Sequence, residues 1–203
     1  IMPCTLSRTA LVTALASLAS FAMNAQDSQQ QETYNPVTYE EIENPDPTEW
    51  LMWRRTQNHW GYSPLDQINK ESVGDLRLAW AWTMEPGMQE TTPLVRDGVM
   101  FLPQACDFIE AVDARDGSPI WEYRRERVDH AASLSCANRN ATLYGDKLYI
   151  ATGDAYLVAL SALTGEVSWE RQIGDWTIGQ HYSGGPQTVS YTHLTLPTRR
   201  GVG

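Results

Sequence analysis

The sequence predicts an all-β fold that forms part of a β-propeller, because one pattern of strands and turns occurs twice at a fixed interval. AVDARDGSPIWE occupies residues 111–122, and ALSALTGEVSWE follows at residues 159–170, beginning 48 residues after the first copy begins. A repeat of this length is typical of propellers and solenoids. The chain also has eight Trp and nine Tyr, residue types that favour strands.

Each copy contains the parts that a four-stranded propeller blade needs. A strand begins after a Gly/Asp pair, a second apolar run follows, and a turn then contains Gly117 or Gly165. Glycine suits a turn position that requires positive φ. Trp121 and Trp169 each lie four residues beyond that glycine, where a large ring can pack between neighbouring sheets. We therefore expect two blades, at residues 91–124 and 141–172.

The N-terminal residues indicate export. Arg8 precedes an apolar run that ends at the small residue Ala25, so residues 1–25 read as a secretory signal peptide. A membrane anchor that stays in place is the alternative interpretation. Residues 26–44 are polar and are expected to form a flexible leader. Export would place the mature chain in the periplasm.

Residues 45–190 are expected to form the N-terminal part of the propeller. A short helix is predicted to begin at Asp46, with Glu49 completing a capping box. Leu76–Trp82 alternates apolar and other residues, which predicts a strand with one buried face. Residues 179–186 are expected to turn into a third blade. Residues 191–203 match no repeat, so we interpret them as a non-native tail, with a divergent native terminus as the alternative.

Charge and cysteine content limit the function classes. The net charge of −10 and the pI near 4.8 argue against nucleic acid as a partner. Of three cysteines, Cys4 would leave with the signal peptide, and the remaining pair, Cys106 and Cys136, suits one disulfide in an oxidising compartment. The histidines lack the spacing of a metal site. Two blades already occupy much of the 203 residues, so the chain is expected to be a fragment or to complete its ring with other chains.

Five ordered motifs and a Tyr-Ser-Gly-Gly-Pro turn carry a resemblance to a known family. They are YSPLDQIN (Tyr62–Asn69), LAWAW (Leu78–Trp82), QETTPLVRDGVMFL (Gln89–Leu102), AVDARDGSPIWEYRR (Ala111–Arg125), NRNATLYGDKLYIAT (Asn138–Thr152) and YSGGP (Tyr182–Pro186). Together they resemble the N-terminal quarter to third of the quinoprotein alcohol dehydrogenases, the methanol- and ethanol-dehydrogenase-like enzymes that use pyrroloquinoline quinone (PQQ). The resemblance implies an eight-bladed propeller with PQQ and a Ca²⁺ or lanthanide ion on its axis.

The resemblance assigns three cofactor-binding residues. Glu90 matches the family's cofactor-contacting glutamate, Arg139 matches the arginine that meets the PQQ carboxylates, and Ser183 stands where a hydroxyl residue hydrogen-bonds PQQ. The chemistry agrees, because PQQ carries three carboxylates. Arginine presents a planar fork to a carboxylate, and a serine hydroxyl adds a donor without further charge.

The chain also departs from the family pattern. The family's adjacent cysteine pair would fall near Ser133 and Leu134, and Cys136 lies shortly beyond them. Because the loops that carry Cys106 and Cys136 should open on the same face of adjoining blades, a Cys106–Cys136 disulfide is our hypothesis. The family's catalytic Asp and calcium ligands would lie further on. We therefore expect no catalytic or metal-binding residue within this chain, and no turnover by it alone.

For the full-length protein, the resemblance implies oxidation of an alcohol to an aldehyde or ketone, with electrons passing from PQQ to a c-type cytochrome. A homo-oligomer is compatible with this function. The alternative from another class is a noncatalytic propeller of PQQ-like repeats that serves as a binding or assembly scaffold in the cell envelope. Such a scaffold keeps the tryptophan turns but needs neither Glu90 nor Arg139.

Overall fold

The computed structural model describes residues 33–127, 136–190 and 193–195. The chain divides into two units, Ile1–Glu32 and Thr33–Gly203, and every described residue belongs to the second. The expected signal peptide and the first part of the expected leader therefore lie outside the described residues. Most of the expected non-native tail lies outside them as well. The signal peptide and the non-native tail therefore stay predictions.

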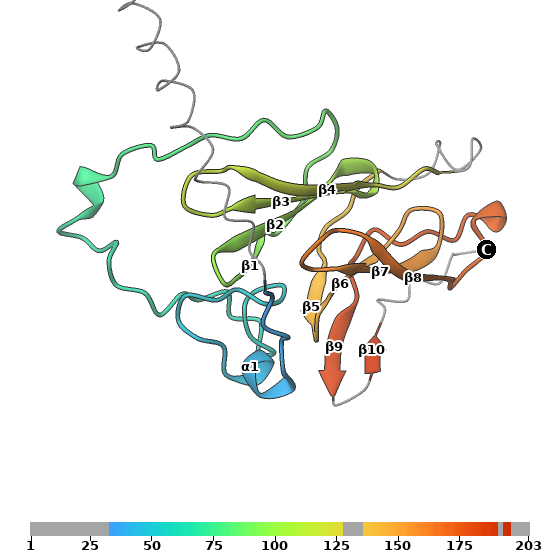
Figure 1. The fold of residues 1–203 in the computed structure, drawn as a ribbon, viewed down its shortest axis with the longest axis horizontal. Helices are drawn as coiled ribbons and strands as arrows, with labels where there is room; N and C mark the ends of the chain where they lie inside the picture. The colour runs from blue at the N-terminus through green and yellow to red at the C-terminus, as the bar shows by residue number, and fades with distance from the viewer. Residues whose placement is uncertain (1–32, 128–135, 191–192, 196–203) are drawn as a thin grey trace, which may run out of the picture. The chain divides into compact units, whose positions relative to one another are not determined.

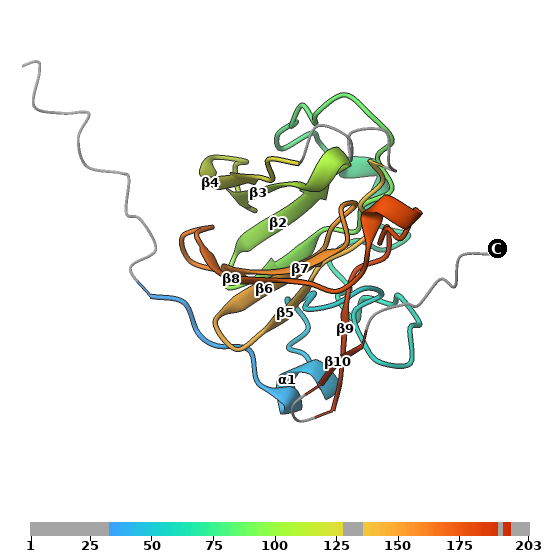
Figure 2. The same ribbon diagram turned by 90° about the vertical axis from the view of Figure 1, so that its right-hand side faces the viewer.

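Two four-stranded antiparallel sheets dominate the fold, and they lie beside each other as successive blades do (Figures 1 and 2). The first sheet contains β1 (Leu94–Arg96), β2 (Val99–Gln104), β3 (Phe108–Asp113) and β4 (Pro119–Arg124), in that order. The second contains β5 (Thr142–Tyr144), β6 (Lys147–Ala151), β7 (Tyr156–Ser161) and β8 (Val167–Gln172), again in order. The predicted all-β partial propeller is thus confirmed.

The sequence repeat is also a repeat of strand register. Ala111 pairs with Trp121 across β3 and β4, and Ala159 pairs with Trp169 across β7 and β8. In both sheets the register shifts directly after that alanine. Such a bulge increases the local twist of the strand pair. The repeat therefore fixes the position of each indole on the outer strand of its sheet.

The indole of Trp121 joins the first sheet to the second. Its Nε1 donates a hydrogen bond of 3.1 Å to the carbonyl of Ala162, and its ring lies against Gly165. A Cβ atom built on Gly165 would come 2.5 Å from Cε3 of the ring. Gly165 also has a φ of +74°, so glycine is required there by its conformation and by its contact.

The same contact precedes the first sheet. Trp80 Nε1 donates to the carbonyl of Ala114 at 3.1 Å, and its ring covers Gly117 at the β3–β4 turn. The predicted strand over Leu76–Trp82 is nevertheless wrong, because these residues pair with no strand among those described. Leu78 is 83% exposed. The alternation reflects indoles that dock onto one side of the first sheet, not membership of that sheet.

The structure has a short helix that precedes the predicted one. Helix α1 spans Tyr39–Glu43, and Thr38 and Glu41 form its capping box. Ile42, on the inner face of the helix, is fully buried. The structure therefore differs from the expected flexible leader over residues 33–44.

The helix predicted at Asp46 is a turn. Asp46 Oδ1 accepts a hydrogen bond from the backbone N–H of Thr48 at 2.9 Å, so the aspartate still caps this segment. Glu49 does not complete a capping box, because its Oε1 accepts from the backbone N–H of Asp97 at 3.0 Å. That contact ties the segment to the β1–β2 turn of the first sheet.

The remaining elements are short. They are the 3₁₀ turns η1 (Val73–Asp75), η2 (Ala105–Asp107) and η4 (Trp176–Ile178), and the strands β9 (Gln187–Ser190) and β10 (His193–Thr195). β9 and β10 pair in antiparallel fashion, as the first two strands of a third blade would. Whether the residues from 191 onward are native stays a prediction.

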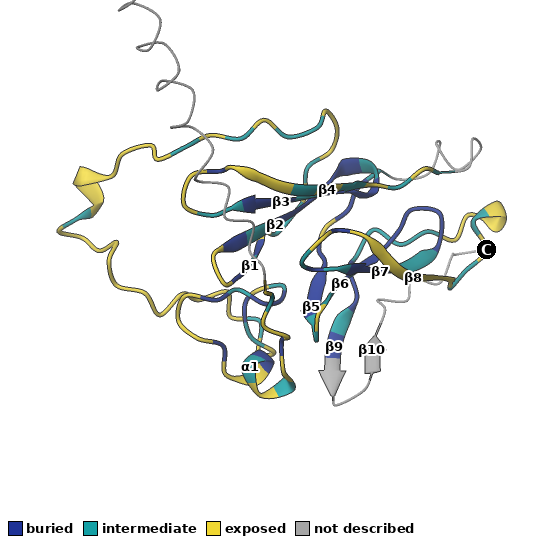
Figure 3. Cartoon of the chain, in the orientation of Figure 1, coloured by how far each residue is buried: buried dark blue, intermediate teal, exposed yellow. Residues whose placement is uncertain are grey.

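The core lies between the two sheets and the N-terminal segment. Buried positions concentrate on β2, β3, β6 and β7, whereas β8 is exposed along its whole length (Figure 3). The largest fully buried side chains include Ile42, Leu51, Leu94, Phe101, Ile109, Leu143, Leu148 and Ile150, which belong to one cluster. Among the described residues, no helix has the length and apolar character needed to cross a membrane.

The Trp121–Gly165 contact gives a stability prediction with a matched control. Gly165→Ala adds a methyl group where the indole lies, whereas Gly98→Ala adds one at almost the same φ, +76°, with nothing within 4 Å. Both variants should lose roughly 1–2 kcal/mol of unfolding free energy from the left-handed backbone. Gly165→Ala should lose clearly more, measured by urea denaturation. Equal losses would contradict the indole contact.

Candidate functional site

The three residues expected to bind the cofactor occupy equivalent places in three successive sheets. Glu90 precedes β1 by four residues, Arg139 precedes β5 by three, and Ser183 precedes β9 by four. Each of these strands is the first of its sheet. The propeller repeat therefore brings together residues that are far apart in the sequence.

The three side chains meet at Arg139. Its Nη2 lies 2.7 Å from Oε2 of Glu90, and its Nη1 donates to Oγ of Ser183 at 2.5 Å. The backbones are joined as well. Thr92 N–H donates to the Arg139 carbonyl at 3.1 Å, and Arg139 N–H donates to the Ser183 carbonyl at 3.0 Å. We call Glu90, Arg139 and Ser183 the entrance cluster.

The entrance cluster is accessible to a ligand. The side chains of Arg139 and Glu90 are 47% and 36% exposed. An ion pair this open contributes little to the stability of the fold. An accessible guanidinium held by a carboxylate and a hydroxyl suits a ligand carboxylate, because arginine binds carboxylates through two parallel N–H donors. The residues present therefore fit the carboxylate groups of PQQ.

Several residues beside the cluster were given no role on the basis of the sequence. Asn140 Oδ1 accepts from the backbone N–H of Gly185 at 3.0 Å, and a Cβ atom on Gly185 would come 2.0 Å from the Asn140 carbonyl oxygen. Gly185 is thus required for close packing of the two backbones. Asn138 is buried and Thr91 is half-buried with a shielded hydroxyl, and their side-chain polar atoms find no hydrogen-bond partner among the described residues. The asparagine on each side of Arg139 was the sequence feature that could have pointed to these contacts.

Cys106 and Cys136 form a disulfide, with a Cα–Cα separation of 4.1 Å. It joins η2, at the end of β2, to the segment that leads into Arg139. The backbone N–H of Cys106 also donates to the Cys136 carbonyl at 2.7 Å. The bridge therefore holds the β2–β3 connection of the first sheet against the entry to the second.

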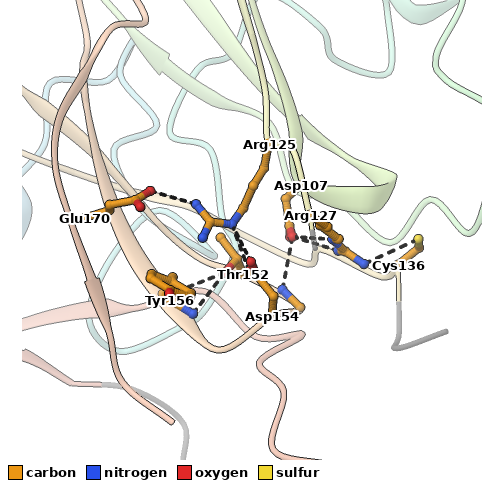
Figure 4. A network of polar contacts seen from close by, with 9 residues as sticks. Asp107, Arg125, Arg127, Cys136, Thr152, Asp154, Tyr156 and Glu170 are labelled. Carbon is orange, nitrogen blue, oxygen red and sulfur yellow. Dashed lines mark hydrogen bonds and ion pairs between the residues drawn. The ribbon is translucent and has the colours of Figure 1, made fainter. Parts of the chain in front are cut away.

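A buried ion pair adjoins the disulfide (Figure 4). Asp107 Oδ2 accepts from Nη2 of Arg127 at 2.7 Å and from Nε at 3.0 Å, and it also accepts from the backbone N–H of Gly153 at 3.0 Å. Burial raises the pKa of the Asp107 carboxyl above its ordinary value, although Arg127 and the Gly153 N–H act in the opposite direction. One aspartate thus links the first sheet to the β6–β7 turn of the second.

A second ion pair crosses between the same sheets (Figure 4). Arg125 Nε lies 2.8 Å and 2.9 Å from the two carboxylate oxygens of Asp154, and its Nη1 lies 2.9 Å from Glu170. The guanidinium also stands over the ring of Tyr156, 4.5 Å from its centroid. Arg125 and Asp154 are buried. Since Arg125 and Arg127 both follow β4, this connection is held at two points.

The described histidines lie outside any metal cluster. His59 packs edge-on against Trp53, with ring centroids 5.1 Å apart, and His181 Nδ1 lies 3.1 Å from the Gly179 carbonyl oxygen. Within residues 33–127 and 136–190, no group of three or more His, Cys, Asp or Glu side chains could hold a metal ion.

The fold and the entrance cluster define a class of protein: a β-propeller in which an accessible arginine, a carboxylate and a hydroxyl meet where the blades begin. A comparison with family models is more specific. The model described as the PQQ glucose/ethanol/alcohol dehydrogenase β-propeller domain matches residues 50–168. The chain belongs to this family, the quinoprotein alcohol dehydrogenases.

Individual relatives agree with this assignment. The chain is 40% identical over 127 residues to the dehydrogenase subunit of the quinone alcohol dehydrogenase of Komagataeibacter europaeus, covering 61% of this chain and 17% of that protein. It is 35% identical over 162 residues to the quinone 1-butanol dehydrogenase of Thauera butanivorans, covering 75% and 26%. The chain thus spans about a sixth to a quarter of the length of these curated relatives.

Solved structures show the same architecture. Quinohemoprotein alcohol dehydrogenase ADHIIG from Pseudomonas putida HK5 superposes with a TM-score of 0.69 at 31% identity, covering 77% of this chain and 24% of that one. A europium-containing methanol dehydrogenase superposes with a TM-score of 0.68 at 28% identity, covering 74% and 27%.

The buried pair at Arg125 gives a second stability prediction. Arg125→Met leaves the Asp154 carboxylate buried without its cation, which should cost about 3–5 kcal/mol of unfolding free energy. Arg115→Met removes the partner of Asp113 from a pair in which the arginine is 85% exposed, and should cost less than about 1 kcal/mol. Urea denaturation of both variants tests the difference. A loss at Arg125 as small as that at Arg115 would show that the pair does not join the sheets.

Proposed function

We propose that the whole protein, with this chain as its N-terminal part, is a PQQ-dependent alcohol dehydrogenase that oxidises an alcohol to an aldehyde or ketone. We further propose that the electrons pass to a c-type cytochrome. The family membership and the relatives named for quinone-linked alcohol oxidation support this function. The observation that carries it is the meeting of Glu90, Arg139 and Ser183 before the first strands of three successive sheets.

Each residue of the entrance cluster has a role in this proposal. Arg139 binds a carboxylate of PQQ through its exposed guanidinium. Glu90 orients that guanidinium by its 2.7 Å contact and balances part of its charge. Ser183 donates or accepts one further hydrogen bond without adding charge. Because the Arg139 backbone is hydrogen-bonded to the backbones of Thr92 and Ser183, the cluster is preorganised for its ligand.

When bound, PQQ supplies an ortho-quinone that accepts the electrons of the alcohol, beside a Ca²⁺ or lanthanide ion that acts as a Lewis acid. The europium-containing methanol dehydrogenase among the structural neighbours is in keeping with such a metal. We propose that the catalytic base and the metal ligands belong to the rest of the protein. What this chain contributes is therefore binding and orientation of the cofactor.

A periplasmic location is proposed on two grounds. The N-terminal sequence has the basic, apolar and small-residue order of a signal peptide. The Cys106–Cys136 disulfide suits an oxidising compartment.

The test is a titration of this chain with PQQ in the presence of Ca²⁺, followed by quenching of tryptophan fluorescence. Arg139→Ala should weaken binding about tenfold to a hundredfold, because a charge-assisted hydrogen bond is worth roughly 1.5–3 kcal/mol. Arg139→Lys should restore only part of the affinity, since lysine lacks the fork.

Arg115→Ala is the matched control, because it removes an exposed arginine from the β3–β4 turn, away from the entrance cluster. It should leave the dissociation constant unchanged. If Arg139→Ala and Arg115→Ala bind PQQ alike, Arg139 does not contact the cofactor and the scaffold alternative is favoured.

A further inference from the structure

The four residues Gln104–Asp107, at the end of β2 and in η2, contact the segments that lead to Glu90 and to Arg139. We call them the anchor segment. Gln104, which is fully buried, accepts through Oε1 from the backbone N–H of Glu85 at 2.7 Å. The backbone N–H of Ala105 donates to Oε1 of Gln89 at 3.3 Å. The residue directly before Glu90 is thus attached to the anchor segment.

The other half of the anchor segment is attached to the connection that carries Arg139. Cys106 holds Cys136 by the disulfide and by the 2.7 Å backbone hydrogen bond, and Cys136 is three residues before Arg139. Asp107 holds Arg127, at the start of the same connection. Arg127 Nη1 in turn lies 3.6 Å from Sγ of Cys136 (Figure 4). The connection that carries Arg139 is therefore attached at Arg127 to Asp107 and at Cys136 to the adjacent residue Cys106.

The backbone of the anchor segment is held in an uncommon conformation. Cys106 and Asp107 have φ values of 60° and 58°, in the left-handed region that residues other than glycine rarely adopt. Such conformations cost free energy and persist where surrounding contacts determine them. Close packing adds to these contacts, since a Cβ atom on Gly87 would come 2.8 Å from that of Ala105.

We propose that the Cys106–Cys136 disulfide is a positioning element for Arg139, so that opening the bridge weakens the hold of this chain on an anionic carboxylate ligand. The part that concerns the ligand rests on the proposed function. The cysteines do not touch Arg139. They act through residues 136–139, which place the Arg139 backbone where it hydrogen-bonds to the backbones of Thr92 and Ser183.

The first experiment measures position without any cofactor. Amide hydrogen exchange is followed in the oxidised chain and after reduction with tris(2-carboxyethyl)phosphine. That reagent takes oxygen from water to become its oxide while the disulfide gains two electrons and two protons. The amides of Thr92 and Arg139 should exchange at least tenfold faster in the reduced chain, because their hydrogen bonds join the segments that the bridge aligns. Amides of β3 and β7 should be unchanged.

The second experiment measures affinity. Since the reductant would react with a quinone, Cys106→Ser and Cys136→Ser are titrated with PQQ in place of the reduced chain. Both should bind at least tenfold more weakly than the unaltered chain. Arg115→Ala, an exposed substitution that leaves the bridge intact, is the control and should bind as the unaltered chain does.

The outcomes separate this inference from the proposed function. Unchanged exchange at Thr92 and Arg139 overturns it. Faster exchange of β3, β7 and the site together also overturns it, because the bridge would then stabilise the whole fold and position nothing in particular. Faster exchange at the site alone, with equal PQQ affinity for the unaltered chain and for Arg139→Ala, supports the positioning role while the proposed cofactor contact of Arg139 fails.

Discussion

The packing of an indole on a glycine of the next sheet is the contact on which the rest of the structure depends. Trp80 lies on Gly117, and Trp121 lies on Gly165, each with a hydrogen bond from the indole nitrogen to a nearby carbonyl. A glycine is needed because any side chain would occupy the space of the ring. This contact sets the separation of neighbouring sheets, and the separation places the starts of their first strands within reach of one side chain, that of Arg139.

Charged groups reinforce this arrangement at the end of the sheets where the entrance cluster lies. Arg125 and Arg127 follow β4, and their carboxylate partners include Asp154 in the second sheet and Asp107 in the first. Removing either partner would leave an uncompensated buried charge, so these pairs strongly penalise a shifted arrangement even though their net contribution to stability is small. Indole packing brings the sheets together, and the ion pairs fix how they are aligned.

The repeat made the blades predictable, whereas long-range partners made other parts unpredictable. The observed β1–β4 and β5–β8 begin and end within a few residues of the expected blades, because strands, turns and tryptophans recur at one interval. The segment Leu76–Trp82 alternates like a strand, and a strand also requires a neighbour, which no local pattern specifies. Glu49 looked like a capping residue, yet its partner, Asp97, is distant in sequence. Motif resemblance located Glu90, Arg139 and Ser183, but not the anchor segment, since positive φ at Cys106 and Asp107 has no sequence signal.

The entrance cluster takes one residue from the segment before each of three successive sheets. This distribution limits which blades can be duplicated or replaced. A repeat architecture consists of similar units, each of which contacts its neighbours. Here a copy inserted between the first and second blades would separate Glu90 from Arg139, and an exchanged second blade would bring its own residue in place of Arg139. The contacts of Arg139 therefore tie these blades into one unit, although each is a self-similar sheet that could otherwise be duplicated independently.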